Sequence, residues 1–299
     1  MKLKEFSMNT VKTAVLMALL TAILVAVGGS IGGSSGAMIM LLISLGMNFF
    51  SYWFSDSIVL KTYGATEVTA AEAPDLYRLV EKLAMNAGLP MPKVCIINSD
   101  VPNAFATGRN PSHAAVAVTT GIMRALDYNE LSGVLAHELS HVKHRDTLIS
   151  TVAASIAGVI SMIAQVAQFA AIFGGGRSSD DDRDGGGSLV GSLVTIIIAP
   201  LAASIIQMAI SRSREYDADK SGGEICGNPI YLANALRKIE MYSQRAVLPN
   251  ATPATSHMFI INPLSGVKQT FSSLFSTHPA TSERIDRLNE QAREMRLIR

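Results

Sequence analysis

Long uncharged apolar runs alternate along the chain with segments in which charged residues are frequent. No charged residue occurs between Thr13 and Ser55, and two apolar stretches, residues 13–27 and 37–54, fit inside that interval. Each is close to the roughly 20 residues that cross a bilayer core. A cleaved signal peptide would explain only the first stretch. The Gly- and Ser-rich residues 28–36 between them therefore predict a helical hairpin in a membrane.

Two further uncharged runs cover residues 148–173 and 189–210. Pro200 lies inside the last run, where a membrane helix tolerates a kink. With the first hairpin, these runs predict four transmembrane helices. Residues 174–188 between them are rich in Gly and Asp and are interpreted as a solvated outer loop. A calcium site is the alternative, but the spacing lacks the ligand periodicity of an EF-hand.

The segment between the two pairs of apolar runs predicts short, mixed elements. Pro74 opens an amphipathic helix that Gly88 ends. Residues 93–98 and 114–119 predict two short strands, and residues 103–108 between them are small and extended in character. The sequence therefore predicts a mainly helical membrane protein with a small β-sheet.

Composition agrees with a membrane protein and excludes one class of partner. Hydrophobic residues make up 48% of the chain, charged residues 16%, and the mean hydropathy is +0.29. The formal net charge of +1 argues against a nucleic-acid partner. The two cysteines, Cys95 and Cys226, lie far apart without C-x-x-C spacing, which predicts free thiols in a reducing compartment.

The distribution of Lys and Arg predicts the membrane topology. Residues 28–36 contain neither, and residues 174–188 contain only Arg177 and Arg183. The basic residues that flank the spans on the other side are Lys2, Lys4, Lys12, Lys61, Lys143, Arg145, Arg212 and Arg214. By the positive-inside rule, both termini and the polar segments between the hairpins face the cytoplasm.

An H-E-x-x-H motif occurs at His137, Glu138 and His141, in a segment of helical character. Residues four apart on a helix share a face, so the two histidines can bind one metal ion. Glu138 lies one position further round, within reach of a metal-bound water. Zinc with two imidazole ligands and an open position is a hydrolytic catalyst, because it lowers the pKa of its water to about 7. A polar helix face that matches by chance is the alternative.

A third zinc ligand has to come from elsewhere in the chain. Glu215 and Asp219 are four apart and share a helix face after the fourth apolar run. The sequence favours Glu215 as the ligand, with Asp219 accepting a hydrogen bond from a ligand histidine. The alternative is a charged helix start in which Arg212 and Arg214 pair with these acids.

His144 is a competing candidate because it lies on the stripe of His137 and His141. Seven residues of helix rise about 10.5 Å, whereas zinc ligands bind at about 2.0–2.1 Å. His137 and His144 on one unbroken helix therefore cannot both bind the same zinc ion.

Three motifs occur in order along the chain: H-E-L-S-H at 137–141, S-R-x-R-E-Y-x-A-D at 211–219 and T-H-P-x-x-x-x-R-I at 277–285. Together with four spans, they resemble the HtpX-type heat-shock membrane zinc metalloproteases, gluzincin relatives of the CAAX prenyl endopeptidases. The resemblance covers nearly the whole chain. It implies a zincin-like α+β protease domain on the cytoplasmic side.

The resemblance also implies the roles of particular residues. One zinc ion per chain would be bound by His137, His141 and Glu215, with Glu138 as general base. His278 and Arg284 would approach the site and steady the oxyanion. The residues of an edge strand that receives the substrate would be Asn103, Ala104, Phe105, Ala106, Thr107 and Gly108.

The expected domain organisation follows from these assignments. An N-terminal transmembrane hairpin covers residues 1–60, and a cytoplasmic zincin part with the H-E-x-x-H helix covers 61–147. A second hairpin covers 148–210. A cytoplasmic helical part, 211–299, carries the third ligand.

The expected function is an endopeptidase of the bacterial inner membrane that cleaves misfolded or damaged membrane proteins as quality control. A prenyl-protein endopeptidase is one alternative, but such enzymes have more spans and a large chamber. A non-hydrolytic zinc-binding protein or transporter is the other. Transporters usually place ligands within spans, whereas this motif lies in a polar segment. Oligomeric state has no sequence signature here.

Overall fold

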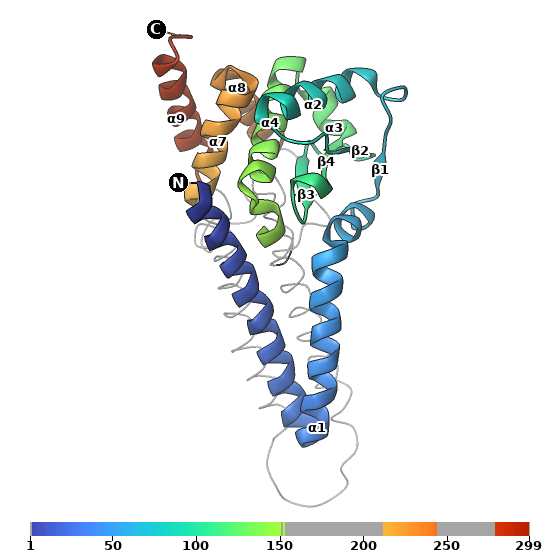
Figure 1. Cartoon of the computed structure of the whole chain (residues 1–299). Helices are drawn as coiled ribbons and strands as arrows, with labels where there is room; N and C mark the ends of the chain where they lie inside the picture. The colour runs from blue at the N-terminus through green and yellow to red at the C-terminus, as the bar shows by residue number, and fades with distance from the viewer. Residues whose placement is uncertain (1, 151, 153–211, 244–278, 299) are drawn as a thin grey trace, which may run out of the picture.

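The computed structural model describes residues 2–150, 152, 212–243 and 279–298. Within these residues the protein is mainly helical and contains one four-stranded mixed sheet. A long helical hairpin extends away from a compact domain of shorter helices and the sheet (Figure 1). The predicted third and fourth spans and the loop at 174–188 lie almost wholly outside the described residues.

The hairpin is formed by α1 (Lys2–Thr62), which is broken at Gly32 and Gly33. Gly33 has a φ of 59°, a conformation that glycine adopts without steric cost. Two segments are long and apolar enough to cross a membrane, Val11–Ser30 and Gly32–Phe54. The prediction of a nine-residue linker at 28–36 is therefore wrong, because the flanking Gly and Ser residues continue the helices and two glycines suffice for the turn.

The two arms of the hairpin are joined by a polar contact within their apolar surfaces. Nδ2 of Asn48 donates to the Thr21 hydroxyl at 2.9 Å and to the Met17 carbonyl at 3.2 Å. Because such groups lack water partners in a bilayer, the contact stabilises the register of the arms.

The sheet has the order β1-β2-β4-β3, with a parallel pair in the middle and antiparallel pairs at both sides. The strands are β1 (Ala65–Glu67), β2 (Lys93–Ile97), β3 (Ala104–Gly108) and β4 (Ala114–Thr119). The strands predicted at 93–98 and 114–119 are confirmed to within one residue. The extended residues at 103–108 form β3, which lies at an edge of the sheet.

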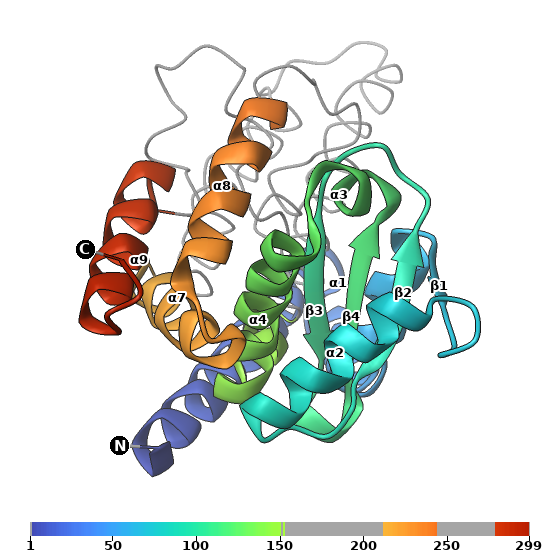
Figure 2. The ribbon, with the colours of Figure 1, turned by 90° about the horizontal axis from the view of Figure 1, so that it is seen from above.

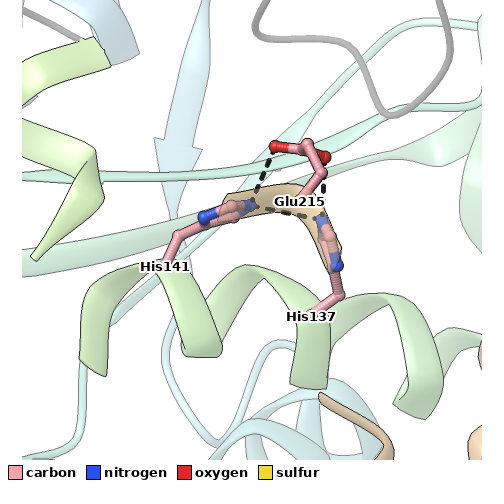
Figure 3. A group of neighbouring side chains, drawn as sticks. All are labelled: His137, His141 and Glu215. Atoms are coloured by element: carbon pink, nitrogen blue, oxygen red, sulfur yellow. Dashed lines mark hydrogen bonds and ion pairs between the residues drawn. The ribbon is translucent and has the colours of Figure 1, made fainter. Parts of the chain in front are cut away.

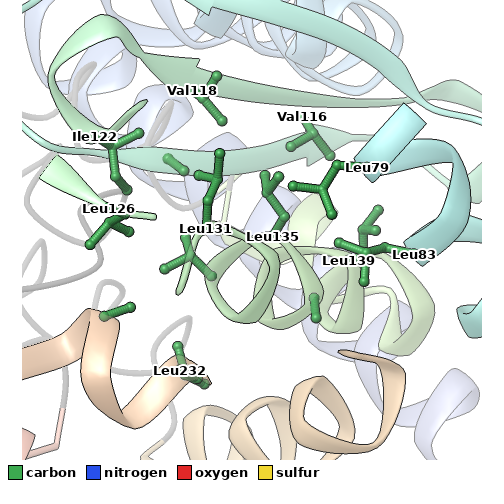
Figure 4. Close-up of a cluster of buried hydrophobic side chains, with 14 of the residues drawn as sticks. Leu79, Leu83, Val116, Val118, Ile122, Leu126, Leu131, Leu135, Leu139 and Leu232 are labelled. Carbon is green, nitrogen blue, oxygen red and sulfur yellow. The ribbon is translucent and has the colours of Figure 1, made fainter. Parts of the chain in front are cut away.

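Helices cover both faces of the sheet. On one face, α2 (Pro74–Ala87) and α4 (Tyr128–His144) pack against the strands, and the short α3 (Thr120–Ala125) links β4 to α4. The buried side chains shared by these elements include Leu79, Leu83, Val116, Val118, Leu131, Leu135 and Leu139 (Figure 4). On the other face, the domain end of α1 packs Val59 and Tyr63 against Phe105. The sheet is thus held between the hairpin and the core helices.

The remaining described helices lie on the side of α4 away from the sheet (Figure 2). They are α7 (Arg212–Cys226), α8 (Pro229–Ser243) and α9 (Thr281–Glu294). Gly133 lets α8 approach α4 closely, because a Cβ at this position would collide with the backbone of Leu232. α4 is consequently buried on nearly all sides, which fixes the helix that carries H-E-x-x-H.

Candidate active site

Local sequence signals define the start of α4. The Asp127 carboxylate accepts from the backbone N–H of Glu130, and the Glu130 side chain accepts from the N–H of Asp127, which is a capping box. Lys238 from α8 donates to the same Glu130 carboxylate at 2.6 Å. The start of α4 is therefore fixed both by its own cap and by α8.

The other end of α4 differs from the prediction. The helix was expected to run to Asp146, but it ends at His144 because Arg145 adopts a left-handed conformation with φ of 61°. A new helical turn starts at once with Asp146. Its neighbour Thr147 donates to the carbonyl of Gly108, the last residue of β3. This corner connects the end of the H-E-x-x-H helix to the edge strand.

Two histidines of α4 and one carboxylate of α7 point at a common centre (Figure 3). The Nε2 atoms of His137 and His141 lie 3.2 Å apart. Oε2 of Glu215 lies 3.7 Å from Nε2 of His137, and Oε1 of Glu215 lies 3.5 Å from Nε2 of His141. His137 and Glu215 are buried, and the His141 side chain is 17% exposed.

These spacings fit a zinc ion. Ligand atoms at about 2.0–2.2 Å from a tetrahedral ion lie about 3.3–3.6 Å from one another. The separation of the two imidazole nitrogens is close to that range, and each of these nitrogens has a Glu215 oxygen within 3.7 Å. Two imidazoles with one carboxylate are a ligand set typical of catalytic zinc, which leaves the fourth position open. No fourth side chain of the described residues belongs to this group.

The third ligand reaches the site because α7 packs very closely against α4. Glu215, Asp219 and Gly222 share one face of α7, at spacings of four and three residues. A Cβ on Gly222 would lie 3.0 Å from the backbone N and Cα of His137, so only glycine permits this approach without a shift. The close approach brings Glu215 and Asp219 beside the two histidines.

The distal ring nitrogen of His137 is held by an ion pair that crosses three helices. Asp219 Oδ1 lies 2.9 Å from His137 Nδ1, and Asp219 also accepts from Nε and a terminal nitrogen of Arg284, at 2.8 and 2.6 Å. Burial alone would raise the pKa of Asp219, but the Arg284 charge and the hydrogen bonds from Arg284 and His137 lower it below its usual value. Asp219 is thus an anion that orients His137, the position expected for it.

A second carboxylate, which was not predicted from the sequence, contacts the distal ring nitrogen of His141 as Asp219 contacts that of His137. Asp146 Oδ2 lies 3.3 Å from His141 Nδ1, and Arg214 lies 3.9 Å from the other Asp146 oxygen. On a continuous helix, Asp146 would point about 140° away from His141. The contact forms only because Arg145 ends the helix, and a non-glycine residue in that conformation has no sequence signal.

The charges around His141 change its protonation. Burial alone would lower the pKa of its imidazolium, but the hydrogen bond to Asp146 and the charges of Glu215, Asp146 and Glu138 raise the pKa to about 9. Metal ligation requires the neutral ring. A cation that binds near neutral pH therefore displaces a proton from His141.

The contact to Asp146 leads to a testable prediction. Asp146→Asn keeps the shape of the side chain but removes its charge, so His141 is oriented less firmly and is a weaker ligand. We expect zinc affinity to fall by roughly 10- to 100-fold. Competition with a zinc-binding dye measures it, with Asp286→Asn, an exposed residue of α9, as the control. Wild-type affinity in Asp146→Asn would show that the contact does not support ligation.

Glu138 lies beside the ligand group and contacts the edge strand. Its carboxylate accepts from the backbone N–H of Ala106 in β3 at 2.9 Å. Glu138 is buried, and within the described residues it is outside the ligand triplet. The structure thus brings the base candidate and β3 together, as the sequence resemblance implied.

The other predicted residues are placed as follows. Arg284 is 1% exposed and lies behind the ligands, with its terminal nitrogen 3.5 Å from the His137 ring. His144 contacts Ser221 and is outside the group formed by His137, His141 and Glu215. Both cysteines are free thiols, as predicted. His278 lies outside the described residues.

Comparisons with known proteins agree with this geometry. A sequence profile of peptidase family M48 matches residues 70–292. Protease HtpX homologues of Thermodesulfovibrio yellowstonii and Pyrococcus furiosus are 59% and 55% identical over 96% of this chain, and cover 99% and 98% of their own lengths. The crystal structure of S. mikatae Ste24p is similar in fold, with a TM-score of 0.54 and 17% identity over 96% of this chain and 67% of that one. The chain is a metalloprotease that belongs to peptidase family M48 and resembles its HtpX-type members over nearly its full length.

Proposed function

We propose that the protein is a membrane zinc endopeptidase that hydrolyses unfolded segments of misfolded or damaged membrane proteins on the cytoplasmic side, as quality control. The observation that carries the proposal is the ligand group of His137, His141 and Glu215 beside Glu138 and the edge strand β3. The proposal assigns to this place a hydrolytic base, a metal site with an open position and a site for an extended peptide.

The edge strand β3 offers backbone groups to an extended peptide. Residues 103–108 were expected to receive the substrate, and the outward N–H of Ala106 supports this role because it points at Glu138 rather than at β4. A peptide that pairs with β3 lies next to the ligand group. A carbonyl of the peptide can accept the hydrogen bond from the Ala106 N–H in place of Glu138. The Glu138 carboxylate is then free to contact the attacking water.

In this proposal each residue of the site has a separate role in hydrolysis. A zinc ion held by His137, His141 and Glu215 would supply Lewis acidity toward the scissile carbonyl oxygen and would acidify water. Glu138 accepts a proton from the attacking water and passes it to the leaving amine. Asp219 and Asp146 hold the histidine rings through their distal nitrogens. Arg284 secures Asp219, and its contribution to the oxyanion, like that of His278, stays a prediction.

A cleavage assay tests the proposed function. The purified full-length protein is mixed with an unfolded protein such as casein, with zinc, with a chelator, and with zinc restored after chelation. Cleavage at internal peptide bonds that stops with chelator and returns with zinc supports the proposal. Stoichiometric zinc without cleavage would favour the alternative of a non-hydrolytic zinc protein or transporter.

The alternative of a prenyl-protein endopeptidase comes from the resemblance of the motifs to the CAAX prenyl endopeptidases. The two functions predict different substrates. Equal amounts of a farnesylated peptide and its unmodified counterpart separate them. We expect the protein to cleave both at rates within a few-fold of each other, whereas strict dependence on the prenyl group would favour the alternative.

The proposed topology has four spans in a bacterial inner membrane, with residues 28–36 and 174–188 on the outer side. Its support is the scarcity of Lys and Arg in both segments. Cysteines introduced as Ser34→Cys and Ser179→Cys should react with an impermeant thiol reagent in intact cells, in a background without Cys95 and Cys226. Ser213→Cys should react only after lysis. Labelling of Ser213→Cys alone in intact cells would invert the topology.

A further inference from the structure

The edge strand β3 lies along the domain end of α1 and runs in the opposite direction. The ring of Phe105, near the start of β3, lies 5.4 Å from the ring of Tyr63. Arg109, just after β3, lies over the ring of Trp53 at 4.8 Å and donates to its carbonyl at 3.1 Å. Trp53 belongs to the candidate span Gly32–Phe54, whereas Tyr63 comes after it. β3 therefore points toward the bilayer (Figure 1).

The outer edge of β3, beside which the described residues place no further strand, has a defined position relative to the candidate span. In an antiparallel ladder, alternate residues exchange hydrogen bonds with the neighbouring strand. The Asn103 carbonyl accepts from the N–H of Thr119, the last residue of β4, and the Ala106 N–H points away from β4, so Ala104 and Ala106 present their backbone groups outward. At the membrane end, Thr147 already occupies the Gly108 carbonyl. Within the described residues, the outward backbone groups of this edge are thus few and lie opposite Glu138; Ala104 is 1% exposed and Ala106 is partly exposed.

The direction of β3 sets the direction of a peptide that pairs with it. β3 pairs antiparallel with β4, and antiparallel pairing is slightly more stable per residue than parallel pairing. A peptide bound antiparallel at the outer edge has its N-terminal part at the Gly108 end, toward the bilayer. Its C-terminal part lies at the Asn103 end, away from the bilayer.

We infer that the enzyme selects membrane-protein segments by their chain direction, called polarity below. It cleaves cytoplasmic segments that follow a membrane span in sequence, in preference to segments that precede one. The inference rests on the proposed endopeptidase function. A segment leaving the bilayer C-terminal to its span enters the β3 edge directly, whereas a segment that precedes its span must turn back first. Three extended residues, from Arg109 to Ala106, cover about 10 Å. The cut is therefore expected about four residues or more beyond the span.

Two matched substrates test the polarity. Both contain one span and the same unstructured tail, which follows the span in one and precedes it in the other. Each is reconstituted with the full-length, zinc-loaded enzyme in liposomes, and protease protection selects the molecules whose tail lies on the side of the catalytic domain. Both tails are confined equally at the membrane, so only their direction differs.

We expect the tail that follows the span to be cut at least about tenfold faster, at a site about four residues or more from the span. Equal rates, or faster cleavage of the preceding tail, would overturn the polarity. The free tail, added as a soluble peptide, tests the proposed function separately. If the free tail is cut while the tethered substrates show no preference, the polarity alone fails; if the free tail is not cut, the proposed function fails and the polarity with it.

Discussion

Glu138→Gln protein is expected to retain about one zinc ion per chain while its hydrolytic rate falls by about 10²–10⁴-fold. The substitution keeps the shape of the side chain and removes the general base, whose typical contribution is of that size. Glu138 is adjacent to the ligand group but is not part of it. Metal analysis and initial cleavage rates on the same preparation check this result.

Glu215→Gln should show the opposite combination of losses. It replaces an anionic ligand by a neutral amide, so zinc should bind much more weakly and activity should be lost with the metal. Glu224→Gln, an exposed residue of the same helix, is the matched control and should retain both. If Glu215→Gln bound zinc with wild-type affinity, the third ligand would have to be sought at Asp219 or Asp217.

Arg284→Met is expected to lower the stability of the fold by about 3–5 kcal/mol. Arg284 is 1% exposed, and its bidentate contact compensates the buried charge of Asp219. Removing one partner leaves the other charge buried and uncompensated. Unfolding of the detergent-solubilised protein by denaturant measures the change.

Two variants separate this effect from a general loss of packing. Arg293→Met, on the exposed face of the same helix, should change stability by no more than about 0.5 kcal/mol. Arg284→Met combined with Asp219→Asn removes both charges and should be more stable than Arg284→Met alone. If the double variant were the less stable of the two, the aliphatic part of Arg284, rather than its charge, would be what the fold requires.

Local sequence signals predicted the parts of the fold that depend on neighbouring residues. Pro74 and the left-handed Gly88 bound α2 as expected. β2 and β4 occur where β-branched residues gather between turns. The four-residue spacing of His137 and His141 was enough to place both rings on one side of α4, because helix geometry alone determines it.

Other features depend on long-range packing or on unusual backbone conformations. The contact between His141 and Asp146 requires Arg145 to leave the helix, and a conformation usually adopted by glycine is not predicted for arginine. Glu215 meets the histidines only because Gly222 lets α7 approach α4. For that ligand the residues alone left a charged helix start as an alternative, and the resemblance of the motifs to a known family decided between them.

The central claim is that His137, His141 and Glu215 hold one zinc ion on which hydrolysis depends, and zinc content measured together with activity tests it most directly. Full-length protein is titrated with chelator, and zinc per chain and cleavage rate are determined on each sample. The account predicts about one zinc per chain before titration, activity proportional to bound zinc, and recovery when zinc is restored. Full cleavage by protein that retains less than about a tenth of a zinc ion per chain would contradict it.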